Sequence, residues 1–164
     1  MATIKLASRR SAKTGGGKSA YPKRKTATGH WATFRNAIVR EGPSGRIDRI
    51  RAGTYANSLI GAAAAIGVSR ETIFHLVGLP VSTATRKIAQ QAILDTPTTE
   101  RLARLALVEQ QAEDTFGDSD LAKRWLRSTN VALGGCTPVS MLDTDVGTRE
   151  VAKVLVALAR GGVV

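Results

Sequence analysis

Cysteine is almost missing from this sequence: Cys136 is the only one in 164 residues. A disulfide within the chain is therefore excluded, and a reducing compartment is expected. Long apolar runs are also missing, because no stretch approaches the roughly 20 residues of a membrane span. The N-terminus lacks the apolar core of a secretory signal. The sequence thus predicts a cytoplasmic protein without a membrane partner.

Aromatic side chains are scarce, at 4% of the residues, whereas alanine, leucine and valine are abundant. This composition favours a helical interior over a β-sandwich. A length of 164 residues suits one domain or two small ones, enough to bury a core. We therefore expect an all-α protein.

Acidic residues are nearly missing from the first third of the chain. Residues 1–51 hold thirteen Lys and Arg against Glu41 and Asp48, which gives +11, whereas residues 52–164 hold eleven of each sign. Residues 1–29 contain no acid and little periodicity, which predicts a disordered basic arm. Such an arm binds polyanions by counterion release. A solvated tail without a function is the alternative.

Groups suited to catalysis are equally sparse. His30 and His75 stand apart from any serine or carboxylate arrangement, and Cys136 has neither a histidine partner nor a second thiol for a metal. Asp143 and Asp145 form a carboxylate pair, but their place at a helix start favours capping. We expect no enzyme activity, no cofactor and no metal site.

What the sequence does contain is a series of short amphipathic helices. Apolar residues recur three and four positions apart in segments that end at glycine, around residues 31–38, 47–50 and 59–66. Ser69 and Ser82 are expected to cap two further helices. Successive short helices joined at glycine predict a helix-turn-helix.

Two frames compete for that motif. One places a small residue, a turn glycine and two buried residues at Ala63, Gly67, Ile73 and Leu76. The other is centred on Gly78, with bulky Phe74 at the small position and Lys87 where a buried residue is expected. From the residues alone both frames stay open, as does a helical dimerisation core that binds no DNA.

Pro97 marks a boundary, after which apolar residues recur at helical spacing as far as Phe116. Ser119 is expected to cap the next helix, whose apolar stripe consists of Leu121, Ala122, Trp125 and Leu126. Gly134-Gly135 permits a tight loop, and Thr137-Pro138 opens a short helix. A last helix starts near Thr144 and buries Val151, Val154, Leu155 and Leu158.

Residues 125–151 have the sequence WLRSTNVALGGCTPVSMLDTDVGTREV. This run resembles the C-terminal toxin-binding domain of the Xre/MbcA/ParS antitoxin family, whose pattern is approximately W-L-x-x-x-N-x-A-L-G-G-x-T-P-x-x-L-L-D-T-x-x-G. The matching residues are Trp125, Leu126, Asn130, Ala132, Leu133, Gly134, Gly135, Thr137, Pro138, Leu142, Asp143, Thr144 and Gly147. Met141 stands where leucine is usual. The resemblance runs from about Arg46 to the chain end.

This resemblance implies an Xre-like helix-turn-helix within residues 30–96 and a toxin-binding domain over residues 97–164. It assigns the helix-turn-helix to the frame centred on Gly78. DNA contacts are then expected from the second helix of that frame, at Thr83, Thr85, Arg86 and Lys87.

The partner implied by the resemblance is a RES-type toxin that destroys NAD, with the antitoxin's C-terminal end near the entrance to the toxin's active site. Toxin contacts are expected from Asn130, Gly134, Gly135, Arg149, Arg160, Gly161, Gly162, Val163 and Val164. The implied antitoxin also represses its own operon, as a homodimer within a larger toxin–antitoxin complex. The alternative is a stand-alone helix-turn-helix regulator of transcription.

Overall fold

The computed structural model describes residues 26–161 of the chain. These residues form α-helices and two short 3-10 helices, and the β-pairing among them is confined to one bridge between Tyr55 and Ile93. The all-α prediction is confirmed. The elements are α1 (Ala27–Arg40), α2 (Pro43–Ala52), α3 (Ser58–Ile66), α4 (Arg70–Leu76), α5 (Val81–Ala89), α6 (Thr96–Phe116), α7 (Ser119–Arg127), η1 (Val131–Leu133), η2 (Pro138–Met141) and α8 (Asp145–Ala159).

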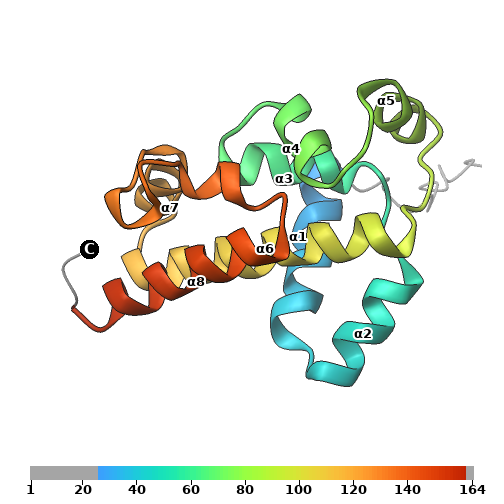
Figure 1. The fold of residues 1–164 in the computed structure, drawn as a ribbon. Helices are drawn as coiled ribbons and strands as arrows, with labels where there is room; N and C mark the ends of the chain where they lie inside the picture. Colours follow the sequence, from blue (N-terminus) through green and yellow to red (C-terminus); the bar gives the residue numbers. More distant parts are fainter. Residues whose placement is uncertain (1–25, 162–164) are drawn as a thin grey trace, which may run out of the picture.

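The long helix α6 runs through the middle of the molecule (Figure 1). Helices α7 and α8 pack along its C-terminal part, whereas α1 packs against both α3 and α6. Helices α2 and α5 lie near the N-terminal end of α6, on opposite sides of it in this view (Figure 1). One continuous hydrophobic core joins all these parts, from Trp31 in α1 to Leu155 in α8.

Helix α1 begins earlier than the sequence suggested. Thr26 caps it, since the Thr26 hydroxyl accepts a hydrogen bond from the Gly29 amide at 3.1 Å. The expected disordered arm of residues 1–29 is therefore wrong for residues 27–29, which are helical. Residues 1–25 of that arm lie outside the described residues. The predicted stripe of Trp31, Phe34 and Ile38 is confirmed, because all three are buried.

Two predicted helix caps are wrong by one or two residues. Helix α5 begins at Val81 after Pro80, whose carbonyl accepts from the Ala84 amide, so Ser82 already lies within the helix. Helix α7 is capped by Asp118, whose carboxylate accepts from two backbone amides at 2.9 and 2.8 Å, which leaves Ser119 as the first helical residue. The caps predicted at Ser69 and Thr137 are confirmed.

The stripe predicted for α7 is only partly buried. Ala122 and Leu126 are in the core, and the ring of Trp125 packs against Phe116 with 5.7 Å between ring centroids. Leu121 is 43% exposed, so its place in the buried stripe is wrong. Asp143 and Asp145 do not cap α8 either; Thr144 does, through its hydroxyl and the Gly147 amide.

An ion cluster that contains one buried carboxylate joins α1 to α6. Arg35 Nε lies 3.0 Å from Glu109 Oε2, and the Arg35 guanidinium also pairs with Glu113. Glu109 is only 6% exposed. Burial raises the pKa of Glu109 to about 7, against the opposing effect of the Arg35 charge. This contact places a titratable group between the first helix and the central one.

No single helix among residues 26–161 is long and apolar enough to span a membrane. Helices α3 and α4 meet that test only when taken together, and the chain bends by 108° between them.

Candidate functional site

Helices α4 and α5 are joined by a tight turn that only glycine fits easily. Gly78 has φ 70°, in the left-handed region, and the Leu79 amide donates to the Phe74 carbonyl at 2.8 Å. This 6→1 hydrogen bond is that of a Schellman turn. Pro80 then precedes α5, which begins at Val81. The turn expected at Gly78 is therefore present, with a helix on either side.

Helix α5 presents most of its surface to solvent. Ala84 is its only fully buried residue, whereas Thr85 and Arg86 are exposed. Thr83 and Lys87 are half-buried, and Lys87 Nζ lies 3.9 Å from the Asp95 carboxylate. Of the four residues predicted to touch DNA, Thr85 and Arg86 are thus the most available.

The competing frame also has helix-turn-helix geometry. Ala63, Ile73 and Leu76 are buried, and Gly67 has φ 80° in the turn. The 108° bend between α3 and α4 lies in the range typical of the motif. The second helix of this frame, however, exposes Glu71 among its surface residues. Arg70 offsets the Glu71 charge there, whereas α5 contains Arg86 and Lys87 and no acid, so α5 has the larger excess of positive charge.

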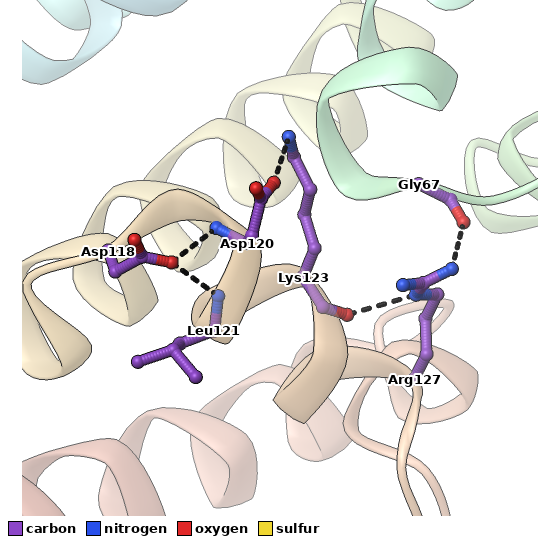
Figure 2. A network of polar contacts seen from close by, with 6 residues as sticks. All are labelled: Gly67, Asp118, Asp120, Leu121, Lys123 and Arg127. Carbon is purple, nitrogen blue, oxygen red and sulfur yellow. Dashed lines mark hydrogen bonds and ion pairs between the residues drawn. The ribbon is translucent and has the colours of Figure 1, made fainter.

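The α3–α4 turn is tied to the C-terminal half of the chain by α7 (Figure 2). Arg127 Nη1 donates to the Gly67 carbonyl at 3.1 Å, and Arg127 Nε donates to the Lys123 carbonyl at 3.1 Å. At the start of α7, Asp118 caps the helix and Asp120 pairs with Lys123 at 3.4 Å. This network spans the length of α7 and reaches across to the turn before α4.

The corner between α7 and α8 is organised by Asn130. Its side-chain carbonyl accepts from the Ala132 amide at 2.8 Å, its backbone carbonyl accepts from Gly135 at 2.9 Å, and its amide donates to Cys136 at 3.0 Å. Gly134 and Gly135 are exposed and adopt φ 67° and 81°. Asn130 therefore shapes this corner from within, while the two glycines form its surface.

The sequence did not single out the apolar side chains that this half exposes. Val131 beside the corner is 91% exposed, and Val146 in the first turn of α8 is 63% exposed. Both stand outside the stripes that form the core. An apolar residue that falls outside the buried face of its helix is expected on the surface, and this could have been recognised from the sequence.

One face of α8 combines charge with apolar surface. Arg149, Ala152, Lys153 and Val156 line a shallow groove of 410 Å³. Arg149 pairs with Asp145 at 2.7 Å, and Lys153 pairs with Glu150 at 2.7 Å. Both pairs are exposed, so each stabilises the helix only slightly and leaves its cation available.

The helix ends at Ala159, the exposed Arg160 is its C-cap, and Gly161 follows with φ 77°. Arg149 and Arg160 lie eleven residues apart, close to three full turns, so they share one face about 16 Å apart along the axis. Gly162, Val163 and Val164 lie outside the described residues. The predicted toxin contacts thus fall into a corner, with Asn130, and a helix face that leads to the chain end.

Groups able to bind a metal do not gather in the part of the chain that the structure describes. Within residues 26–161, no three His, Cys, Asp or Glu side chains are placed to hold an ion. Cys136 is a free, exposed thiol.

Comparison with known proteins assigns the helix-turn-helix region and the region of the corner and α8 to two different domains. Residues 45–107 match the Antitoxin Xre-like helix-turn-helix domain, and residues 111–161 match the Antitoxin Xre/MbcA/ParS C-terminal toxin-binding domain. Both helix-turn-helix frames lie in the first range, and both the corner and α8 lie in the second.

Individual relatives and a solved structure lead to the same family. A Prs ADP-ribosylating antitoxin from Sphingobium is 32% identical over 134 residues, covering 76% of this chain and 84% of that protein. An antitoxin Xre from Pseudomonas putida is 35% identical over 83 residues, 51% of this chain and 52% of that protein. The crystal structure of the M. tuberculosis MbcT–MbcA toxin–antitoxin complex contains a chain that is 25% identical, with a TM-score of 0.51, covering 66% of this chain and 96% of that one. The chain therefore belongs to the Xre/MbcA/ParS family and is an antitoxin of a toxin–antitoxin system.

Proposed function

We propose that this antitoxin neutralises a RES-type toxin that consumes NAD, by covering the toxin's active site with α8 and the chain end. Two relatives support a partner of this kind. One is named for ADP-ribosylation, a reaction that uses NAD, and the other was crystallised in complex with its toxin. The neutralising surface then lies within residues 111–161, which match the toxin-binding domain, and in the three residues that follow them.

The observation that carries the proposal is the exposed face of α8. Val156 is 39% exposed and lies in a groove beside Lys153 and Arg149. An apolar side chain beside two cations suits a partner surface with apolar and acidic groups. Arg160 continues this face at the helix end, where a cation also interacts favourably with the helix dipole.

Truncation after Ala159 tests this assignment. The shortened chain keeps the buried anchor of α8, namely Val151, Val154 and Leu155, so we expect an unchanged fold by circular dichroism and thermal denaturation. Cells that express the toxin should lose protection, because the charge and apolar groups beyond residue 159 are gone. Full protection by the truncated chain would exclude Arg160 and the chain end, and would leave the α8 face from Arg149 to Val156 or the corner around Asn130 as the neutralising surface.

We also propose that the antitoxin represses its own operon through α5. Thr85 and Arg86 on the exposed side of α5 are suited to base-edge and phosphate contacts. Helix-turn-helix proteins bind paired half-sites as dimers, so a homodimer is part of this proposal. Residues 1–29, with eight Lys and Arg and no acid, would add affinity that is independent of sequence.

A pair of substitutions separates the two frames. Arg86→Ala should weaken operator binding by roughly 5- to 100-fold, the range for loss of one good base or phosphate contact, without affecting toxin binding. Arg70→Ala removes an equal charge from α4 and is the matched control. If Arg70→Ala weakens binding and Arg86→Ala does not, then α4 is the helix that reads DNA.

A further inference from the structure

Helix α4 is held at both ends by arginines that are distant in sequence. Arg127 Nη1, from α7, donates to the Gly67 carbonyl in the turn before α4. Arg101 Nη1, from α6, donates to the Val77 carbonyl at the C-terminal end of α4, at 3.1 Å. These bonds cross 60 and 24 positions of the chain, respectively. The turn before α4 and the turn after it are thus each held by a side chain from a later helix.

The guanidinium of Arg127 makes two directed bonds at once. Its Nε is fixed on the Lys123 carbonyl one turn earlier in α7, while its Nη1 reaches Gly67 (Figure 2). A planar guanidinium provides this fork, and the ammonium group of lysine does not. The helix that carries Arg127 is capped at its start by Asp118 and is anchored in the core by Ala122 and Leu126.

Both turn glycines lie against these arginines. A β-carbon at Gly67 would lie 3.4 Å from Arg127 Cζ, and a β-carbon at Gly78 would collide with Arg101 Nη1. Both glycines also adopt positive φ angles. Gly78 therefore serves its turn twice, by its backbone conformation and by the space that admits the Arg101 guanidinium, whereas at Gly67 the backbone conformation alone favours glycine.

Helices α4 and α5 need such support. Helix α4 has seven residues, and short helices gain most of their stability from packing. Helix α5 buries only Ala84 completely, and no side chain caps its start. The direction of α5 therefore follows the position of α4 and of the turn between them.

We propose that Arg101 and Arg127 are positioning residues for DNA recognition, which clamp α4 and thereby orient α5 relative to α6 and α7. The proposal rests on the operator binding proposed above. It makes α7, part of the toxin-binding domain, also a structural element of the DNA-reading unit. The two arginines act on DNA affinity through the helices they hold, without touching DNA.

Amide hydrogen exchange of the full chain tests the clamp itself. Loss of one such hydrogen bond corresponds to about a 3- to 10-fold change in a local opening equilibrium. Arg127→Ala and Arg101→Ala should accelerate exchange of the α4 amides by that factor. Arg124→Ala is the matched control, because its exposed side chain on α7 makes none of the hydrogen bonds described for residues 26–161; exchange should change less than 2-fold. Unchanged α4 exchange in both test variants would overturn the clamp.

Operator titrations over a range of salt concentrations test its consequence. Both arginine variants should bind operator about 3- to 10-fold more weakly, with the salt slope and the affinity for nonspecific DNA unchanged. Arg127→Lys keeps the charge but loses the fork, and should be as weak as Arg127→Ala.

Two results would overturn the positioning role. A salt slope reduced by about one would mean that the arginine touches a phosphate. Operator affinity equal to that of the wild type would mean that α4 does not orient the DNA-reading helix. A wild-type chain that does not distinguish operator from nonspecific DNA would refute the operator function itself, whereas the exchange data would still decide whether the clamp exists.

Discussion

The two halves of this molecule begin their helices in different ways. From residue 95 onward, every described helix starts with a backbone amide that donates to its capping side chain, and the caps are Asp95, Asp118, Asn130, Thr137 and Thr144. In the region of α2 to α5, only α4 has such a cap, at Ser69. Helices α2, α3 and α5 begin without one.

The difference separates locally encoded structure from structure imposed at a distance. A cap lies within three residues of the amide it serves and contributes about 1 kcal/mol. The toxin-binding half therefore contains much of the information for its own helices. Helices α2 to α5 rely on a cap at one helix, on Arg101 of α6 and on Arg127 of α7, so changes elsewhere should affect them more readily.

The largest change in the toxin-binding half should come from Gly147→Ala. A β-carbon there would overlap the backbone carbonyl of Met141 and lie 3.0 Å from its carbonyl carbon. Backbone cannot move aside as a side chain can, so we expect a loss of about 3 kcal/mol in the free energy of unfolding, measured by urea denaturation.

The matched control is Gly45→Ala in α2. There the nearest atom to an added β-carbon is Glu41 Oε2 at 3.2 Å, the end of a flexible side chain. Alanine also favours the helix, so this variant should be about 0.5–1 kcal/mol more stable. Equal effects at the two glycines would contradict the tight contact assigned to η2 and α8.

The second effect tests the helix shared by both halves, through Glu109. Its pKa is raised to about 7 in the folded chain from an ordinary value of 4.5, so the folded state binds more protons between those values. Stability contributed by this group is present below pH 4.5 and is lost as the pH rises through 7. The wild type should therefore lose unfolding free energy between pH 4.5 and pH 8, and Glu109→Gln should reduce that loss by on the order of 1–3 kcal/mol. Denaturation curves at several pH values measure the unfolding free energy of both proteins. If the variant loses as much stability with rising pH as the wild type, another group causes the loss.

The success of sequence reasoning follows the same division. The helical periods, the glycine turns at Gly67 and Gly78, and the cap at Thr137 depend on residues close in sequence, and all were predicted correctly. The expected cap at Ser82 failed because Pro80 already sets the start of α5. At the start of α7, two adjacent residues were both suitable caps, and Asp118 took the place expected of Ser119.

What the sequence could not provide were contacts between distant residues. Nothing local identifies Arg127 as the donor to Gly67 or Arg35 as the partner of Glu109. Similarly, helical periodicity does not show which residues at the edge of an apolar face stay exposed, and Leu121 is one of them. The residues proposed to touch DNA and toxin stay predictions, since their partners are other molecules.

A smaller effect should come from the caps themselves. Thr144→Ala removes the hydroxyl that accepts from the Gly147 amide at 3.1 Å, and should cost about 1 kcal/mol. Ser82→Ala removes a hydroxyl that does not cap α5, and should change stability by less than about 0.5 kcal/mol. Thermal denaturation of the two variants compares the halves directly. If Ser82→Ala loses as much stability as Thr144→Ala, the two halves do not differ in how their helices are capped.

The smallest effect on stability should be that of Val131→Ser. The Val131 side chain is 91% exposed, so it contributes little to its own fold, and the free energy of unfolding should stay within about 0.5 kcal/mol of the wild type. An apolar side chain displayed beside Gly134 and Gly135 suits burial by a partner, and burying a valine contributes about 1.5 kcal/mol or more. If the corner touches the toxin, affinity should therefore fall about 10-fold in a binding titration. Ala132→Ser, at the adjacent exposed position, is the control and should bind normally. Wild-type affinity for Val131→Ser would mean that the toxin-binding half meets its partner through α8 and the chain end alone.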